Sequence, residues 1–237
     1  YRKSALTKSQ LTIHKHVGQH LKMSIEIGIL LKFGKEEHIK DLQENGNVFM
    51  NTIEWFKNYE KDGIGDLYEG AFEVTNIVNA KLTFKFPERP ITLDSKKLQL
   101  RKHYKGHVGN IFSTYALSTK LLRRKNIHRI DKRMNKFGTH CLMIKDIKKF
   151  MDSIRNELDK LKINYSYGLV DYKNLSKNNH ELTNFQKTHK LSYQKEYRII
   201  AWTNQSQVLK LNIGSMKDYT ELYNSEELIE SLIMELK

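Results

Sequence analysis

The clearest periodic pattern in the chain lies in residues 145–162, where apolar side chains recur every three or four positions. This spacing places them along one side of a helix. The apolar positions of that helix are Ile147, Phe150, Met151, Ile154, Leu158 and Leu161. Shorter amphipathic stretches predict further helices at 34–46, 52–59 and 225–236. Gly46 is expected to end the first of these in a left-handed conformation.

Short runs rich in β-branched and aromatic residues alternate with the predicted helices. They predict strands at 25–33, 48–50, 110–118, 142–144, 165–172, 197–202 and 208–213. Two longer runs, 74–86 and 91–100, flank the sequence PERP and predict a long hairpin whose turn holds Pro87 and Pro90. Helices and strands therefore alternate irregularly around a central hairpin. This order predicts an α+β fold with a mixed, mostly antiparallel sheet and packed helices.

The domain organisation predicted from the sequence is simple. Residues 1–22 are polar and basic and precede Met23, so we expect them to form an N-terminal arm or extension. Residues 23–237 are numerous enough to bury one core, and we expect them to form a single domain.

Charge is the most biased feature of the composition. Lys and Arg number 41 against 27 Asp and Glu, a formal net charge of +14. Such an excess favours a polyanionic partner, nucleic acid above all, although heavy lysine usage also arises in proteins from AT-rich genomes. The excess is concentrated in residues 117–138, where eight basic side chains accompany Asp131 as the one acid. We expect a basic helix at 120–136 that lies along a phosphate backbone.

A second basic cluster, residues 101–105, contains a tyrosine that could stack on a base. The residues predicted to contact nucleic acid are Arg101, Lys102, Tyr104, Lys120, Arg123, Arg124, Arg129 and Arg133. The alternative is an ordinary solvated surface, because no helix-turn-helix, RNP or zinc-finger pattern accompanies these residues.

Several classes of protein are disfavoured. Cys141 is the one cysteine, so an internal disulfide is excluded, and no apolar run reaches the length of about 18 residues that crosses a bilayer. The chain contains no G-x-S-x-G, Walker or G-x-G-x-x-G motif and no H-E-x-x-H metal motif. We therefore expect a cytoplasmic protein with no membrane partner and no metal.

The acidic segment 61–70 combines three glycines with Asp62, Asp66 and Glu69. Glycine-rich segments break regular structure, so we expect an exposed, solvated loop. Its carboxylates could otherwise bind a divalent cation, which prefers oxygen ligands.

The residues with the most chemical potential lie in YQKEYR, 193–198. A carboxylate at the start of a buried strand, Glu196, is flanked by Gln194 and Arg198, and such a group can hold a hydroxyl or stabilise a developing cation. The alternative is structural, because Glu196 and Arg198 are two positions apart on a strand and can form an ion pair on one face.

The order of motifs along the chain resembles the DUF2971 family of bacterial and phage proteins. The matching motifs are LLKFG, NVFMNTIEWF, GDLYEG, NIFSTYALS and YQKEYRII. The layout is also similar, more distantly, to ADP-ribosyltransferases. That resemblance implies NAD as cofactor, with Glu196 gripping the nicotinamide ribose and Gln194 contacting the acceptor.

The same resemblance implies a cofactor-binding set of Lys32, Ser113, Thr114 and Arg198. Ser113 and Thr114 partly match the middle motif of those enzymes. The first motif departs from the pattern, because Lys32 stands where they place His or Arg, and lysine lacks the bidentate fork of arginine.

Two hypotheses follow. In the first, the protein is a conflict effector of bacteria or phages, in defence, as a toxin or in counter-defence, with an ADP-ribosyltransferase-like site that acts on nucleic acid or a nucleic-acid-associated target. In the second, it is a non-catalytic basic protein that binds DNA, RNA or an acidic protein partner as an inhibitor or sensor.

Overall fold

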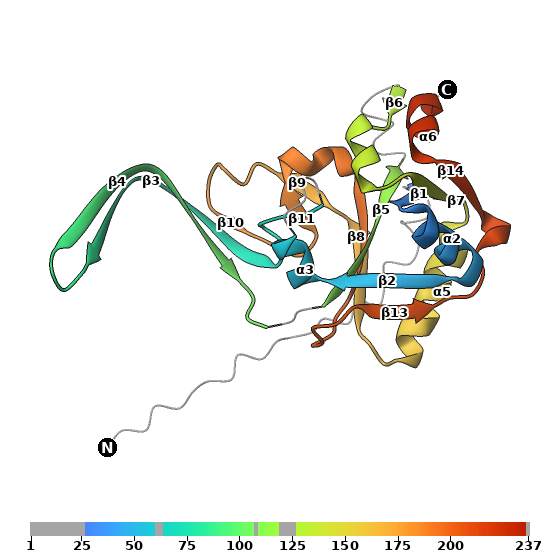
Figure 1. Ribbon diagram of the computed structural model, residues 1–237, viewed down its shortest axis with the longest axis horizontal. Coiled ribbons are helices and arrows are strands. Elements are labelled where there is room, and N and C mark those ends of the chain that lie inside the picture. Colours follow the sequence, from blue (N-terminus) through green and yellow to red (C-terminus); the bar gives the residue numbers. More distant parts are fainter. Residues whose placement is uncertain (1–26, 60–63, 107–108, 119–126, 236–237) are drawn as a thin grey trace, which may run out of the picture.

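The structure is a computed structural model that describes residues 27–59, 64–106, 109–118 and 127–235. Its main sheet is built around β5 (Asn110–Ser118), whose NIFSTYALS sequence is buried at eight of nine positions. The neighbouring strands run antiparallel to it and helices pack on both faces, so the predicted α+β class is confirmed (Figure 1).

One edge of β5 is paired with a single strand over most of its length. β12 (Glu196–Ala201) runs antiparallel to it from Asn110 to Tyr115, and β8 (Tyr165–Leu169) extends the sheet beyond β12. All six residues of β12 are buried. Two of them, Glu196 and Arg198, are charged, and ion pairs allow them to lie inside the sheet.

The opposite edge of β5 is shared by two strands. β1 (Ile27–Gly34) pairs with the end of β5 that begins at Tyr115, and β7 (His140–Ile144) and β14 (Thr220–Asn224) follow it. β2 (Asn47–Thr52) pairs with the other end, at Asn110 and Ile111, and carries β13 (Leu209–Asn212) on its far side.

Between these two partners the sheet is split. Residues 112–114 of β5 pair with β12 on one side, but on the other side they have no strand partner among the described residues. β1 and β2 run apart from this point (Figure 1). The split leaves the middle of β5 open toward the space between β1 and β2.

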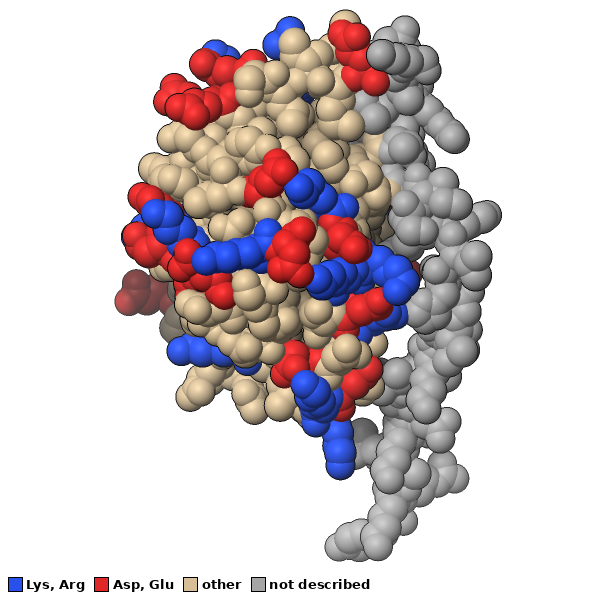
Figure 2. Space-filling model, turned by 90° about the vertical axis from the view of Figure 1, so that its right-hand side faces the viewer, with Lys and Arg blue, Asp and Glu red and all other residues tan. Residues whose placement is uncertain are grey.

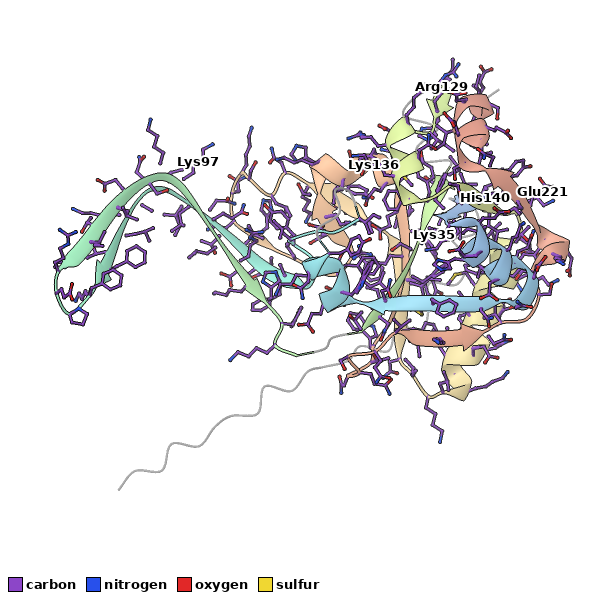
Figure 3. All side chains as sticks on the ribbon, in the orientation of Figure 1. Lys35, Lys97, Arg129, Lys136, His140 and Glu221 are labelled. Atoms are coloured by element: carbon purple, nitrogen blue, oxygen red, sulfur yellow. The ribbon has the colours of Figure 1, made fainter. Side chains whose placement is uncertain are left out.

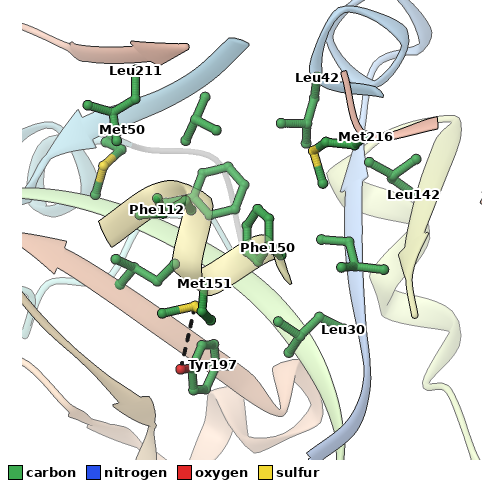
Figure 4. Packing of buried hydrophobic residues seen from close by; sticks show 14 of the residues in the cluster. Leu30, Leu42, Met50, Phe112, Leu142, Phe150, Met151, Tyr197, Leu211 and Met216 are labelled. Atoms are coloured by element: carbon green, nitrogen blue, oxygen red, sulfur yellow. Dashed lines mark hydrogen bonds between the residues drawn. The ribbon is translucent and has the colours of Figure 1, made fainter. Parts of the chain in front are cut away.

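The core has two halves, one on each face of the sheet. α5 (Ile147–Lys160) covers one face, and its Phe150 packs with Leu30, Phe112 and Leu142 (Figure 4). Tyr197 belongs to the same cluster and donates a hydrogen bond to Met151 Sδ at 3.8 Å. α6 (Ser225–Ser231) and the 3-10 helix η1 (Lys132–Phe137) cover the other face. The period of three and four therefore predicted the buried side of α5 correctly at Phe150, Met151, Ile154 and Leu158, whereas Leu161 follows the helix and is exposed.

The other elements are short, apart from the hairpin. They are α2 (Glu36–Asn45), α3 (Ile53–Asn58), β3 (Ala71–Lys85), β4 (Pro90–His103), β6 (Ile127–Arg129), β9 (Asp171–Lys173), β10 (His180–Glu181), β11 (Gln186–Thr188), η2 (His189–Gln194), η3 (Lys217–Tyr219) and β15 (Ile233–Glu235).

Local signals predicted several of these elements well. Helices at 34–46 and 52–59 are confirmed by α2 and α3. Gly46 follows α2 with φ 68° and donates its N–H to Leu42 O, as a left-handed C-cap requires. The hairpin is confirmed as β3 and β4, except that Pro90 is the first residue of β4 and not part of the turn.

Two helix predictions are wrong in part. Residues 127–129 form β6 and 132–137 form η1, so no continuous helix covers the described part of 120–136; residues 120–126 lie outside the described residues. Asp131 interrupts the segment because its carboxylate accepts from Arg133 N and caps η1. The last predicted helix ends at Ser231, since β15 pairs with β6 instead. Both errors come from one strand pair between segments that are distant in sequence.

The described residues hold no helix long and apolar enough to cross a membrane. The predicted N-terminal arm, 1–22, lies outside the part of the chain that the structure describes.

Candidate functional site

A pocket of about 530 Å³ occupies the split between β1 and β2. Eight aromatic side chains line it together with aliphatic ones; the aromatic residues are Phe33, Phe49, Trp55, Phe56, Tyr59, Phe112, Tyr115 and Phe137. Its cations are Lys32, Lys35, Lys187 and Arg198. Glu196 is the one carboxylate among the described lining residues. The pocket therefore combines flat apolar surfaces with an excess of positive charge.

The side chain of Lys32, on β1, reaches the open middle of β5. Its ammonium donates to the backbone carbonyl of Ser113 at 2.8 Å and lies 4.1 Å from the centre of the Phe112 ring. It thus contacts β5 at the position where a neighbouring strand is missing. Burial lowers the pKa of Lys32 to about 8, although the charge of Glu196 acts in the opposite direction. Lys32 is therefore mainly a cation at neutral pH and loses its proton in mildly alkaline solution.

Glu196 lies at the inner end of the pocket, and protein donors surround its carboxylate. Oε1 accepts from Ser113 Oγ and from Arg198 Nε, the latter at 3.1 Å. Oε2 accepts from Lys187 Nζ at 3.1 Å and from Arg198 Nη2 at 3.3 Å. A carboxylate offers about four acceptor positions, so all of them are occupied. Burial alone would raise the pKa of Glu196, but Arg198 and Lys187 outweigh it and hold the pKa well below its usual range.

Arg198 is a cation with 1% of its surface exposed, held between two carboxylates. Besides Glu196, it forms a bidentate pair with Glu69, with N–O distances of 2.8 and 3.0 Å. Its guanidinium also donates to the backbone carbonyl of Asn184. Burial works against the charged form, but the two carboxylates overcome it and raise the pKa of Arg198. The structural alternative for Glu196 and Arg198, an ion pair, is confirmed.

The prediction of a solvated loop at 61–70 is wrong for two of its acids. Asp66 and Glu69 are buried, because Glu69 supplies the second carboxylate that Arg198 needs and the turn carrying both acids folds inward. Asp66 Oδ1 accepts a hydrogen bond from the backbone N–H of Tyr68. Asp62 lies outside the described residues.

Gln194 reaches the pocket, but its side-chain oxygen accepts from Lys187 Nζ at 2.9 Å. Lys187 therefore bridges Gln194 and Glu196, with only 4% of its surface exposed. It was not among the residues predicted from the sequence, and no motif marks it. It lies on β11 within a polar connection, and only the parallel pairing of β11 with β9 brings it to the site.

The structure brings together all six residues predicted for the catalytic and cofactor site. Lys32, Ser113, Thr114, Gln194, Glu196 and Arg198 all border this pocket. Their polar side chains are engaged with one another, with Lys187 and Glu69, or with the backbone. The Thr114 hydroxyl, for example, donates to Tyr197 O at 3.4 Å.

The described members of the predicted nucleic-acid set, Arg101, Lys102, Tyr104, Arg129 and Arg133, are not assembled into one basic surface. Lys102 pairs with Glu73 at 2.8 Å, and the Arg101 guanidinium lies 5.1 Å from the Tyr68 ring. Arg133 pairs with Asp131 at 2.7 Å. Tyr104 is exposed at the end of β4. Part of the predicted positive charge is therefore neutralised locally.

These clusters also lie in different parts of the molecule. Arg129, on β6, is at the end of the body near α6, whereas the hairpin that carries Lys97 extends from another side of the body (Figure 3). Lys120, Arg123 and Arg124 lie outside the described residues.

The face around α2, α5 and β14 is likewise not uniformly basic. Blue and red side chains alternate over it (Figure 2). Lys145 pairs with Glu221 at 2.6 Å and Lys149 with Asp218 at 2.7 Å. The net charge of the chain thus does not produce a single positive surface here.

Comparison of this chain with protein-family models, with curated proteins and with solved structures gave no match. The described residues contain no group of three or more His, Cys, Asp or Glu that could hold a metal ion. What the structure defines is an α+β protein with a split sheet and a cationic, aromatic pocket closed at its inner end by a buried ionic cluster.

Proposed function

We propose that the split-sheet pocket binds a nucleotide, with NAD as the first candidate. We further propose that the protein transfers ADP-ribose to nucleic acid or a nucleic-acid-associated target, as a conflict effector of bacteria or phages. The observation that carries the proposal is the combination of aromatic walls and cations in one pocket. Planar rings stack on aromatic side chains, and ammonium groups bind phosphate. Its volume is also within the range of small-molecule sites.

The two parts of a nucleotide match two parts of the pocket. Trp55 and Tyr59 both line the pocket and are stacked with ring centres 4.3 Å apart; Trp55 keeps 38% of its surface exposed, and we propose that its face not stacked on Tyr59 receives the base. Lys32 supplies a phosphate contact deeper inside, where Ser113 O already orients its ammonium. In this arrangement Lys32 takes the role that arginine or histidine has in the enzymes this sequence resembles.

Transfer of ADP-ribose breaks the bond between C1′ of the ribose and the nicotinamide nitrogen, which leaves with the electron pair. A nucleophile of the acceptor then forms a new bond to C1′ and releases its proton. A carboxylate assists by holding a ribose hydroxyl near the cationic carbon. Glu196 can accept such a hydroxyl only if one of its present donors moves away. Ser113 Oγ is the donor whose loss costs the least free energy, because rotation about one side-chain bond moves it away from Glu196.

The full occupation of the Glu196 carboxylate favours a second candidate function. A nucleotide could bind without reaction, and the protein would then act as a non-catalytic inhibitor or sensor that also binds DNA, RNA or an acidic protein partner. Lys187 and Arg198 reinforce this alternative because they cancel the negative charge that an oxocarbenium-like carbon needs.

The two candidates are separated by incubation with NAD labelled in its adenylate part, together with DNA, RNA and lysate protein. The transferase proposal expects label on an acceptor with the wild type and at least a tenfold loss with Glu196→Gln. Ser113→Ala keeps the carboxylate and should retain transfer. Glu73→Gln, a surface substitution, is the matched control. Binding of NAD without any label transfer would reject the transferase and support the sensor.

A further inference from the structure

The β3–β4 hairpin extends away from the body as a two-stranded arm (Figure 1). Directly opposed residues of an antiparallel pair point to the same face. Leu82 pairs with Leu93 and Phe84 with Ile91, so these four side chains share one face of the arm. Phe86 adds to them, with its ring 6.3 Å from that of Phe84. We call these five residues the apolar face of the arm.

The apolar face is open to solvent. Phe84, Phe86 and Leu93 keep 46%, 54% and 52% of their surfaces exposed. With Ile91, and with Val78 four residues before Leu82 along β3, they present roughly 400 Å² of apolar surface, as much as the largest patch on a typical monomer, and patches of this size are often functional. A two-stranded ribbon is also only marginally stable by itself. Both points indicate that another molecule covers the arm.

The charge of the arm restricts what that molecule is. Residues 78–98 carry five basic side chains against Glu88 and Asp94. A second copy of the arm would place like charges together. Nucleic acid would satisfy the charge but would leave the apolar face uncovered. The partner therefore combines apolar with acidic groups.

The backbone restricts it further. β4 is the last strand of the sheet β10–β3–β4, and its outer edge has no strand partner among the described residues. An unpaired edge exposes N–H and C=O groups that a lipid interior cannot satisfy, whereas an added strand satisfies them. An extended protein segment thus fits the edge, the apolar face and the charge, while an anionic membrane fits only the last two.

We propose that β4 and the apolar face dock an extended segment of a partner protein with alternating apolar and acidic residues, which adds a fourth strand to this sheet. The apolar side chains of the segment cover Phe84 and Leu93. Its acids lie on the other face of the arm, near lysines such as Lys85 and Lys96. This inference stands independently of the nucleotide pocket.

The test uses the full chain and a fluorescent peptide of about eight residues that alternates isoleucine and glutamate, with binding followed by anisotropy. A second peptide replaces glutamate by lysine. A third keeps the acidic side chains but is N-methylated at every residue, which removes the strand N–H donors of both of its edges. The protein variants are Phe84→Ser with Leu93→Ser on the apolar face, and Thr83→Ser with Thr92→Ser as the matched pair on the other face.

The proposal expects binding of the acidic peptide and at least a tenfold loss with the lysine peptide, with the N-methylated peptide and with the Phe84 and Leu93 variant. The threonine variant should bind as the wild type does. Both variants should keep the melting temperature of the body, which shows that they are folded. No binding, or equal binding of the N-methylated peptide, overturns the added strand. Two further results would overturn the proposed partner. One is that the wild type sediments with anionic phospholipid vesicles, and the other is that it dimerises as its concentration rises; in each case the behaviour must be lost in the Phe84→Ser, Leu93→Ser variant.

Discussion

Glu69→Gln tests whether the buried ionic cluster is an energetic requirement of the fold. The substitution keeps the shape of the side chain but removes one of the two negative charges beside Arg198, which is 1% exposed. Breaking a buried pair from one side typically costs about 3–5 kcal/mol. Glutamine retains one acceptor, so we expect the low end, about 3 kcal/mol. For a chain of this size that corresponds to a fall in melting temperature of about 6–12 °C.

The assay is thermal unfolding at neutral pH followed by tryptophan fluorescence, with Glu73→Gln as the control. Glu73 pairs with Lys102 on the surface at 2.8 Å, and its loss should leave the melting temperature unchanged. Burial raises the pKa of Glu69, against the attraction of Arg198 and Lys187. If the proton remained bound at neutral pH, glutamine would imitate the native side chain. Equal melting temperatures for the two variants would therefore refute the charged cluster.

Three other predictions concern proton binding and backbone conformation. Folding lowers the pKa of Glu196, so its charge stabilises the protein at pH values above the ordinary carboxyl pKa of 4.5, and this contribution is lost as the pH falls below 4.5. In denaturant unfolding, the free energy of unfolding should therefore fall more steeply with decreasing pH for the wild type than for Glu196→Gln. Identical slopes would contradict the lowered pKa. The affinity for NAD should fall as the pH rises through about 8, because Lys32 loses its proton there, and Lys32→Arg should remove this fall. A wild-type affinity that stays constant up to a pH of about 10 would show that Lys32 does not bind the phosphates. Gly46 and Gly106 both have positive φ, 68° and 81°. Gly46→Ala should nevertheless destabilise the protein more than Gly106→Ala, because an added Cβ at Gly46 would lie 2.1 Å from Gly214 O, whereas at Gly106 nothing lies within 4 Å. Gly106→Ala should cost about 1 kcal/mol, and chemical denaturation that gives the same value for Gly46 would disprove the close approach.

Much of the fold was predictable because its signals are local. The apolar period of α5, the C-cap glycine of α2 and the alternating runs of the hairpin each depend on residues within one turn or one strand. The elements predicted wrongly depend on distant pairing. Nothing near Ile233 indicates that it will lie opposite Arg129.

The candidate site was predictable only in part for the same reason. Glu196 and Arg198 form a local pair on one strand, and a local motif identified them. The partner that completes the cluster, Glu69, is 129 positions from Arg198 in the sequence. One signal could have indicated it. A strand whose six residues are all interior contains an arginine, and a buried arginine needs more than the one carboxylate that the strand provides. Lys187 had no comparable signal.

The most direct test of the central claim is isothermal titration of the full chain with NAD at pH 7, in parallel with Lys32→Met and with Glu73→Gln as control. We predict binding at one site per chain, with an affinity at least tenfold weaker for Lys32→Met and unchanged for Glu73→Gln. Absence of binding by the wild type, or equal affinity of Lys32→Met and the wild type, would contradict a nucleotide site in the split of the sheet.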